Sequence, residues 1–580
     1  MSYFIKRFCI ALSLFVISSV SYAQNAPLVS YDALFRPTLG LNGMVVSQEY
    51  NASEAGLAML KKGGNAVDAA VATGFALAVT HPQAGNIGGG GFMMIYIKEL
   101  DKVIAVDYRE MAPSRAHRDM FLDGNGNADD QKARWSMQSS GVPGTVAGLV
   151  HILNKYGTLS LSEVLAPAIQ LAEEGFPVSW PFYASLTWAQ KRLKKNTASA
   201  GYFYKADGGV YQPGELLIQR DLANTLRTIA LKGAKGFYEG EVADKIVAAM
   251  EAGAGLITHD DLKNYKVVER EPITGTFRDY KIVSMPPPSS GGIHLVEMLN
   301  VLEGYDLKAM GHNSAAYIHS LTETMKYAYA DRSKYLGDAD FVDVPVKALT
   351  DKAYAASIRA KIDPNRAIPS SEIAPAKDLA YESNETTHFS VADKFGNMIA
   401  STYTLNTSFG NGMSVAGAGF LLNNEMDDFS AKPGSPNAYG LIGGESNAIA
   451  AAKRPLSSMT PTLVFKDGKP FIATGSPGGS TIITITLQQV LNMTEFDMNA
   501  MAANAAPRIH HQWLPDKLFI EPGISADTIK ILESMGHIIP LKVGQSHNNI
   551  LGSVQSIMLK DGVLAGAADP RSGNSHAAAY

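Results

Sequence analysis

Polar and apolar residues alternate over a short stretch in the last third of the chain. Residues 387–391 alternate in this way, which is the pattern of a half-buried β-strand. Residues 393–397 predict a turn, and residues 398–406 predict the returning strand. In the register that this turn sets, Thr386 lies directly opposite Thr404, with both side chains on one face of the hairpin.

The rest of the chain mixes helical and strand patterns and shows no internal repeat. One helix is expected from Ser53 to about Leu77, and one long strand from Thr274 to Met285. Further helices are predicted near 145–156, 162–174, 219–231, 241–252, 259–265, 293–302, 314–335 and 480–491, and further strands near 92–97, 103–108, 462–465 and 471–474. This mixture, with antiparallel hairpins around Thr386, predicts an α+β fold, a four-layer αββα sandwich.

The stretch before Thr386 predicts an exposed loop, because residues 363–383 are polar and contain several prolines. A cut between Glu385 and Thr386 would give Thr386 a free α-amine, and that amine can take the proton of its own hydroxyl. Thr404 could then hold the nucleophile by a hydrogen bond. The plain alternative is that two adjacent threonines are ordinary strand residues. The side chain of His388 is expected to point away from the nucleophile.

The N-terminus has the pattern of a secretion signal. Lys6 and Arg7 precede an apolar run, Phe8 to Val20, and Ser21-Tyr-Ala23 fits a cleavage site. The apolar run is short for a stable span, which makes a retained membrane anchor the weaker alternative. We therefore expect residues 1–23 to be removed, and the mature protein to be periplasmic or secreted and free of the membrane.

Composition excludes several classes of chemistry. The only cysteine, Cys9, lies in the expected signal, so the mature chain has no disulfide and no cysteine nucleophile. The chain has 50 basic and 55 acidic residues, and loss of Lys6 and Arg7 leaves a net charge of −7, which argues against nucleic acid as a partner. The histidines lack metal-ligand spacing, and the glycine run 88–91 leads into a strand rather than a phosphate-binding helix. No metal and no cofactor are expected.

Several longer motifs resemble the γ-glutamyltranspeptidases, which are N-terminal-nucleophile hydrolases. The segment that begins at Glu385-Thr-Thr-His388 resembles the start of their small subunit, and the resemblance continues through Asp107–Glu110, Thr402–Asn406, Leu421–Ser430, Lys453–Met459 and Gly475–Ser480. It covers nearly the whole mature chain and implies the four-layer αββα fold of that superfamily. It also implies a precursor cut into a large subunit, 24–385, and a small subunit, 386–580, which stay together as a heterodimer.

The resemblance implies roles in the reaction for particular residues. Thr386 would be the nucleophile and Thr404 its hydrogen-bond partner. The backbone N–H groups of Gly478 and Gly479, at a strand-to-helix turn, would stabilise the oxyanion, although such a turn alone is often only structural. Tyr439 would lie in a lid that shields the acyl-enzyme from water, the alternative being a loop with one exposed aromatic side chain.

The implied substrate carries an α-amine and an α-carboxylate, so its pocket needs both signs of charge. Contacts to this head group are implied for Arg109, Ser457 and Ser458 at the carboxylate, and for Asn406, Glu425 and Asp428 at the ammonium. Arg109 could instead be a surface charge, and Asp428 a helix cap or loop charge. Relatives carry either glutamine or glutamate at position 425, which leaves the role of Glu425 open.

We therefore expect a self-processing γ-glutamyl transferase and hydrolase. It would cleave glutathione and related γ-glutamyl compounds and pass the acyl group to water or to amino acid or peptide acceptors. A glutaryl-cephalosporin acylase and a poly-γ-glutamate depolymerase are alternatives of the same fold, against which Arg109 and Asp428 argue. A periplasmic solute-binding protein, which would bind a zwitterion without cutting itself, is an alternative of another class.

Overall fold

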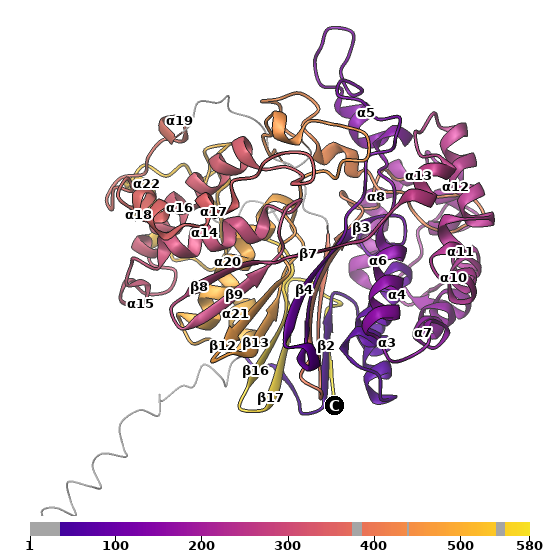
Figure 1. Cartoon of the computed structure of the whole chain (residues 1–580), viewed down its shortest axis with the longest axis horizontal. Coiled ribbons are helices and arrows are strands. Elements are labelled where there is room, and N and C mark those ends of the chain that lie inside the picture. Colours follow the sequence, from indigo (N-terminus) through magenta and orange to yellow (C-terminus); the bar gives the residue numbers. More distant parts are fainter. Residues whose placement is uncertain (1–34, 374–385, 438–439, 541–550) are drawn as a thin grey trace, which may run out of the picture. The chain divides into compact units, whose positions relative to one another are not determined.

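Two seven-stranded antiparallel sheets pack face to face in the computed structural model, which describes residues 35–373, 386–437, 440–540 and 551–580 (Figure 1). The first sheet has the order β18 (His576–Ala579), β2 (Gly43–Ser47), β10 (Thr387–Asp393), β11 (Met398–Thr404), β3 (Gly90–Ile97), β4 (Lys102–Tyr108), β7 (Val268–Arg270). The second has the order β1 (Thr38–Gly40), β17 (Val563–Ala568), β16 (Gln555–Lys560), β13 (Lys469–Thr474), β12 (Thr462–Lys466), β9 (Tyr280–Ser284), β8 (Ile273–Phe277).

Alternate residues of β10 point to opposite sides of the first sheet. Phe389 and Val391 belong to the core that this sheet shares with its covering helices. Ala392 belongs to the core between the two sheets, together with Leu463 of β12 and Ile557 of β16. Since side chains alternate along a strand, the even-numbered positions of β10 face the second sheet.

Helices cover the outer face of each sheet. Helices α3 and α4 pack on β2 and β10, and α6 packs on β4; α14 packs on β8 and β9, and α21 on β16 and β17. The longer helices beside the first sheet are α3 (Tyr50–Lys61), α4 (Ala66–Thr80), α6 (Thr145–Tyr156), α7 (Leu161–Glu174), α8 (Trp180–Leu193), α10 (Arg220–Lys232) and α12 (Glu241–Ala252). Those beside the second are α14 (Gly291–Leu302), α16 (Ala315–Tyr335), α18 (Lys352–Arg359), α20 (Ile482–Thr494) and α22 (Ala526–Ser534), together with the short α21 (Ala500–Ala505). The expected α+β fold is confirmed, with its layers in the order helices, sheet, sheet, helices.

Shorter elements connect these layers. They are α5 (Asp130–Trp135), α9 (Thr197–Phe203), α11 (Lys235–Tyr238), α13 (His259–Asn264), α15 (Leu307–Met310), α17 (Val346–Leu349), α19 (Ser370–Ile373), β5 (Phe176–Pro177), β6 (Leu216–Leu217), β14 (Ile509–His510) and β15 (Phe519–Ile520). All of these elements belong to one compact unit, Pro37–Tyr580. Among the described residues, no helix has both the length and the apolar character needed to cross a membrane.

Two of the expected elements are wrong in the same way, because each is interrupted by a turn. The single helix expected from Ser53 to Leu77 is two helices, since α4 begins anew at Ala66 behind an Asn65 capping box. The long strand expected from Thr274 to Met285 is the hairpin β8–β9, whose turn contains Arg278 at φ 51. A non-glycine residue in this left-handed conformation gives little signal in the sequence pattern.

Candidate active site

Thr386 lies where β10 begins, opposite the end of β11. The two strands pair in the predicted register, with Ala392 opposite Met398 and Thr387 opposite Tyr403. This register brings the hydroxyl oxygens of Thr386 and Thr404 to 3.4 Å from one another. Both side chains are buried and lie on the side of the first sheet that faces the second.

These two threonines line a small pocket with an empty volume of about 280 Å³. The pocket is walled by Arg109, Arg332, Thr386, Thr404, Asn406, Glu425, Asp428, Leu441, Ser457, Ser458, Met459, Gly479 and Ile482. The structure therefore gathers most of the residues that sequence reasoning proposed, although they come from positions more than 300 residues apart.

Arg109 is the centre of a buried ionic cluster. It follows β4, and its guanidinium bonds Glu425 and, at 2.5 Å, Asp428, both from the 3₁₀ turn Glu425–Asp428. Glu110 lies 3.7 Å from the same guanidinium. Burial opposes the charge on Arg109, but the neighbouring carboxylates outweigh burial and raise the pKa of Arg109. The alternative in which Arg109 is a surface charge is wrong, because its side chain is only 1% exposed.

Glu110 and Glu425 are both buried beside Arg109. Burial raises the pKa of Glu110 to about 7, against the opposing effect of the Arg109 charge. Burial also raises the pKa of Glu425 well above its usual range. The two carboxyl groups interact, and burial favours their protonated forms while the Arg109 charge opposes it. Glu110 was not among the expected site residues.

Hydrogen bonds fix the orientation of the other two residues expected at the ammonium end. Asp428 accepts from Asn437 Nδ2 at 3.0 Å. The Nδ2 group of Asn406 donates to the Asn424 carbonyl at 2.9 Å, which makes its amide oxygen the atom suited to accept from a substrate ammonium.

Arg332 is a pocket residue that sequence reasoning missed. It lies near the end of α16, is buried, and donates to the Ser458 hydroxyl at 3.2 Å. A signal for it exists in the sequence, since Ile318, Leu321 and Met325 form an apolar stripe that Arg332 continues at helical spacing. A charge on such a stripe indicates either a buried polar network or a binding site.

The glycine turn between β13 and α20 reaches the pocket. Gly479 lines the pocket and begins the 3₁₀ turn Gly479–Thr481, which leads into α20. Gly478 and Gly479 both have positive φ values, 141° and 53°. A Cβ on Gly478 would lie 2.4 Å from the Thr481 hydroxyl, so other side chains would disrupt the turn.

The expected orientation of His388 is wrong. His388 bonds Thr402 at 2.7 Å, just as Thr386 faces Thr404, so both lie on the same side of the hairpin. The reason is that residues two apart on a strand share a face. The imidazole is buried against Gly475, and burial lowers the pKa of His388 to about 3.

Some expected features lie outside the described residues. These are the signal 1–23, Glu385 at the expected cut, and Tyr439 of the expected lid.

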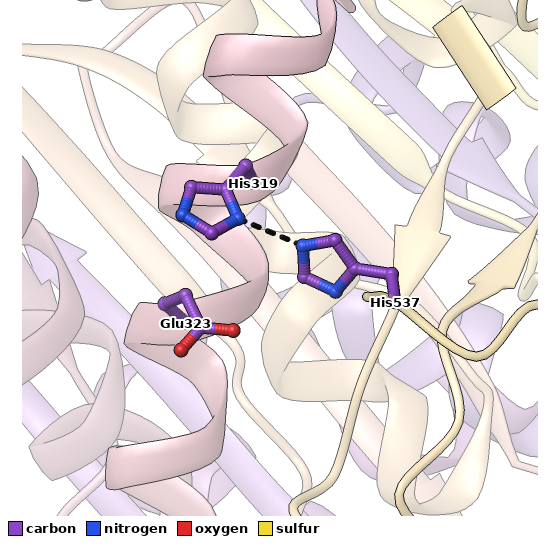
Figure 2. A group of neighbouring side chains, drawn as sticks. All are labelled: His319, Glu323 and His537. Carbon is purple, nitrogen blue, oxygen red and sulfur yellow. Dashed lines mark hydrogen bonds between the residues drawn. The ribbon is translucent and has the colours of Figure 1, made fainter. Parts of the chain in front are cut away.

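One group of side chains in the described part of the chain has the geometry to hold a metal ion. His319, Glu323 and His537 bring one ligand atom each within 4.8 Å of the others (Figure 2). However, His319 and His537 bond one another at 2.8 Å, and Glu323 bonds the buried Lys326 ammonium at 2.8 Å. That positive charge opposes a metal cation, so these contacts favour a structural cluster.

Comparisons with known proteins agree with this geometry. The sequence profile of the family described as Gamma-glutamyltranspeptidase matches residues 52–579. A glutathione hydrolase proenzyme of Escherichia coli (strain K12) is 53% identical over 567 residues, which are 97% of this chain and 96% of the relative. The crystal structure of a γ-glutamyltranspeptidase of Helicobacter pylori is 48% identical, with a TM-score of 0.56, and covers 60% of this chain and 97% of its own. A cephalosporin acylase of Bacillus halodurans is 28% identical, with a TM-score of 0.83 over 96% of this chain and 98% of its own.

The near-complete matches to enzymes show that the chain is an enzyme in its proenzyme form. It belongs to the γ-glutamyltranspeptidase family. The family expected from the sequence motifs is thereby confirmed, and the alternative of a solute-binding protein is wrong.

Proposed function

We propose that the protein is a self-processing γ-glutamyl hydrolase and transferase that acts on glutathione and related γ-glutamyl compounds. The observation that carries this proposal is the position of Thr386. Its hydroxyl faces Thr404 in the wall of a pocket that also contains Arg109 and Asp428. A nucleophile beside groups of both charge signs suits a substrate whose reacting amide is attached to a zwitterionic head.

The first reaction is maturation. The Thr386 hydroxyl attacks the carbonyl of Glu385, the peptide C–N bond breaks, and an ester forms with the Thr386 oxygen. Water then hydrolyses the ester and leaves a Glu385 carboxylate and a free Thr386 α-amine. The products are a large subunit, 24–385, and a small subunit, 386–580, which remain paired as a heterodimer. The solved Helicobacter pylori chain supports such a division, because it is matched almost completely yet covers only 60% of this chain.

The substrate head group would insert between pocket side chains that bond one another, such as Arg109 and Asp428. Its carboxylate would accept hydrogen bonds from Arg109, Ser457 and Ser458, and its ammonium would donate to Asp428 and to the neighbouring Asn406 and Glu425. The bond between Arg109 and Asp428 keeps these two charges paired with one another.

The second reaction is acyl transfer. The Thr386 α-amine takes the proton of the Thr386 hydroxyl, and the oxygen attacks the γ-amide carbonyl of the substrate. The backbone N–H groups of Gly478 and Gly479 stabilise the developing oxyanion. The C–N bond breaks, the proton passes to the leaving amine, and a γ-glutamyl ester remains on Thr386. Water, an amino acid or a peptide then accepts the acyl group, while Tyr439 limits access of water. No cofactor takes part.

The experiment that tests this proposal is a denaturing gel of purified protein. The parent should give two fragments, the smaller beginning Thr-Thr-His-Phe. Thr386→Ala should give one uncut chain without γ-glutamyl hydrolysis. Thr387→Val is the matched control, since it changes the adjacent buried threonine and leaves the nucleophile; it should still be cut. Cleavage of Thr386→Ala, or a different terminus, would contradict the proposal.

A glutaryl-cephalosporin acylase is the second candidate, because a cephalosporin acylase shares the fold over almost the whole chain. The two activities differ at the α-amine, which only the γ-glutamyl group carries, and the poly-γ-glutamate alternative differs in substrate length. The buried Glu425 and the partly buried Asp428 favour a substrate with an ammonium. We also propose that residues 1–23 direct export to the periplasm or beyond and are then removed.

A further inference from the structure

Arg332 is a buried cation held by hydroxyl groups. Its Nε donates to Ser290 Oγ at 3.0 Å and its Nη2 donates to Ser458 Oγ at 3.2 Å. Among the described residues, no carboxylate oxygen pairs with it within 4.0 Å. Burial lowers the pKa of Arg332 to about 10, which leaves it charged at neutral pH. A charge kept in such surroundings needs a reason, because burying it without an anionic partner costs free energy.

Arg332 sets the direction of the hydrogen bonds that its two serine partners make. A guanidinium can only donate, so both serine oxygens must accept from it. Ser290 then donates its own proton to the Ser457 carbonyl at 2.8 Å, and its backbone N–H donates to the same carbonyl at 2.9 Å. Arg332 thereby fastens the loop 457–459 to the loop before α14.

The same rule fixes the hydroxyl of Ser458. Its oxygen accepts from Arg332, so its proton is directed elsewhere, and Ser458 lines the pocket. Ser457 is arranged in a similar way, since its oxygen accepts from the Met459 backbone N–H at 3.1 Å. The hydroxyl oxygens of Ser457 and Ser458 therefore both accept hydrogen bonds from protein donors. Their protons can then be donated to the pocket, which suits an anionic group of a ligand.

We propose that Arg332 is a positioning residue for the α-carboxylate of the γ-glutamyl group. It acts through Ser458, which it turns into a donor, and through Ser290, which holds the loop 457–459 in place. Its charge also adds a second cation beside Arg109 at the carboxylate end of the pocket. This inference rests on the proposed function, because it concerns the same head group.

The test compares two substrates that differ only at the α-carboxylate. They are L-γ-glutamyl-p-nitroanilide and the analogue in which the α-carboxylate is a carboxamide. Arg332→Gln should raise KM for the first by about tenfold to a hundredfold, the effect of one charge-assisted hydrogen bond, with a smaller change in kcat. KM for the carboxamide should change less than about twofold. An equal rise for both substrates, or no rise, would overturn the inference.

Two further variants guard against a folding defect. Arg332→Lys keeps the charge but places one nitrogen where two are needed, so it should show part of the same carboxylate-specific rise. The single variant Ser458→Ala should also raise KM for the carboxylate substrate. The double variant with Arg332→Gln should raise this KM by less than the product of the two single effects. A fully multiplicative double variant, or Arg332→Lys equal to the parent, would contradict action through Ser458.

The matched control is Arg359→Gln. Arg359 is also held by oxygen acceptors, here backbone carbonyls, with Nη1 3.0 Å from the Val301 oxygen, and it lies outside the pocket. It should change neither KM. The cut into two fragments serves as the folding readout for every variant. A parent that stays uncut and releases no p-nitroaniline would refute the proposed function itself, whereas an active parent with an unaffected Arg332→Gln refutes only this inference.

Discussion

The hydroxyl oxygens of Thr386 and Thr404 face one another across the β10–β11 pair at 3.4 Å, and the Asn406 backbone N–H donates to the Thr404 oxygen at 2.9 Å. The Thr404 oxygen thus accepts from both the Thr386 hydroxyl and the Asn406 N–H, and the Thr404 hydroxyl itself points to the Asn406 carbonyl at 3.4 Å. Thr404 is therefore suited to hold the nucleophile in one rotamer before and after the cut.

We predict that Thr404→Val slows both maturation and γ-glutamyl hydrolysis. Valine has the shape of threonine without its hydroxyl, so the variant removes one hydrogen bond worth about 1–3 kcal/mol, or roughly 5-fold to 150-fold in rate. Thr404→Ser is the control and should retain most of both rates. The measurements are the half-time of precursor cleavage and kcat/KM. Equal rates for Thr404→Val and the parent would remove Thr404 from the mechanism.

The pH dependence of hydrolysis should report the Thr386 α-amine. An ordinary α-amine titrates at about 7.7–8.0, and it must be neutral to accept a proton. The rate should therefore rise from pH 6 to about pH 8.5. His388 cannot supply this step, because its pKa is lowered to about 3 and its ring bonds Thr402 and Ser390. A flat profile, with acylation shown to limit the rate, would rule out the amine as base.

Asp428→Asn should weaken the preference for γ-glutamyl over glutaryl substrates. The ammonium of a γ-glutamyl group would donate to Asp428, and a glutaryl group offers no such donor. Asp428 keeps its bond to Arg109 in either case, so it is never wholly unpaired. The discrimination at stake is then one charge-assisted hydrogen bond, about 1.5–3 kcal/mol, or roughly 10-fold to 150-fold.

The measurement is the ratio of kcat/KM for γ-glutamyl and glutaryl anilides, in the parent and in Asp428→Asn. Precursor cleavage should be normal, because the scissile bond does not involve the head-group contacts. An unchanged ratio would show that Asp428 does not read the α-amine.

A stability prediction concerns Glu297 in α14, which does not line the pocket. Its carboxyl group is buried against His294, with Oε2 2.7 Å from Nδ1, and burial raises its pKa to about 8. A raised carboxyl pKa means that the folded state binds the proton more tightly than the unfolded state. Stability is therefore full below the ordinary pKa of about 4.5 and falls as pH rises towards 8. Asp331, whose pKa is raised to about 7 chiefly by burial, shares this trend.

Glu297→Gln should remove the part of this loss that Glu297 causes. The melting temperature of the variant relative to the parent should increase from pH 5 to pH 8, by about 2–5 °C. Glu251→Gln, at an exposed position of α12, is the control and should show no such trend. A constant difference across this pH range would contradict the assignment.

Local patterns predicted those parts of the site that lie close together in sequence. The turn at 393–397 set the β10–β11 register, and with it the Thr386–Thr404 pair. Helix α6, Thr145–Tyr156, was predicted with the same bounds because its apolar spacing is regular. The break at Asn65 and the turn at Arg278 were missed, since one or two residues interrupt patterns that continue on both sides.

The long-range part of the site could not come from periodicity. Arg109 and Glu425 are separated by 316 residues, and only family motifs brought them together before the structure did. Arg332 was missed because the residues around it have the pattern of an ordinary helix. Its importance depends on its contact with Ser458, which is distant in sequence. Side-chain contacts across layers are set by tertiary packing, which no local window contains.

The order of strands in the first sheet has a consequence for the lifetime of the protein. Strand β10 lies between β2 and β11, and β11 lies next to β3, so strands from after the proposed cut are enclosed by strands from before it. The precursor forms these pairs within one chain, whereas the separated subunits would have to find one another in solution. Maturation then makes folding irreversible in practice. The lifetime of the mature enzyme is then set by how slowly it unfolds, that is, by its kinetic stability. After heating, the mature enzyme would not refold, whereas an uncut Thr386→Ala chain could.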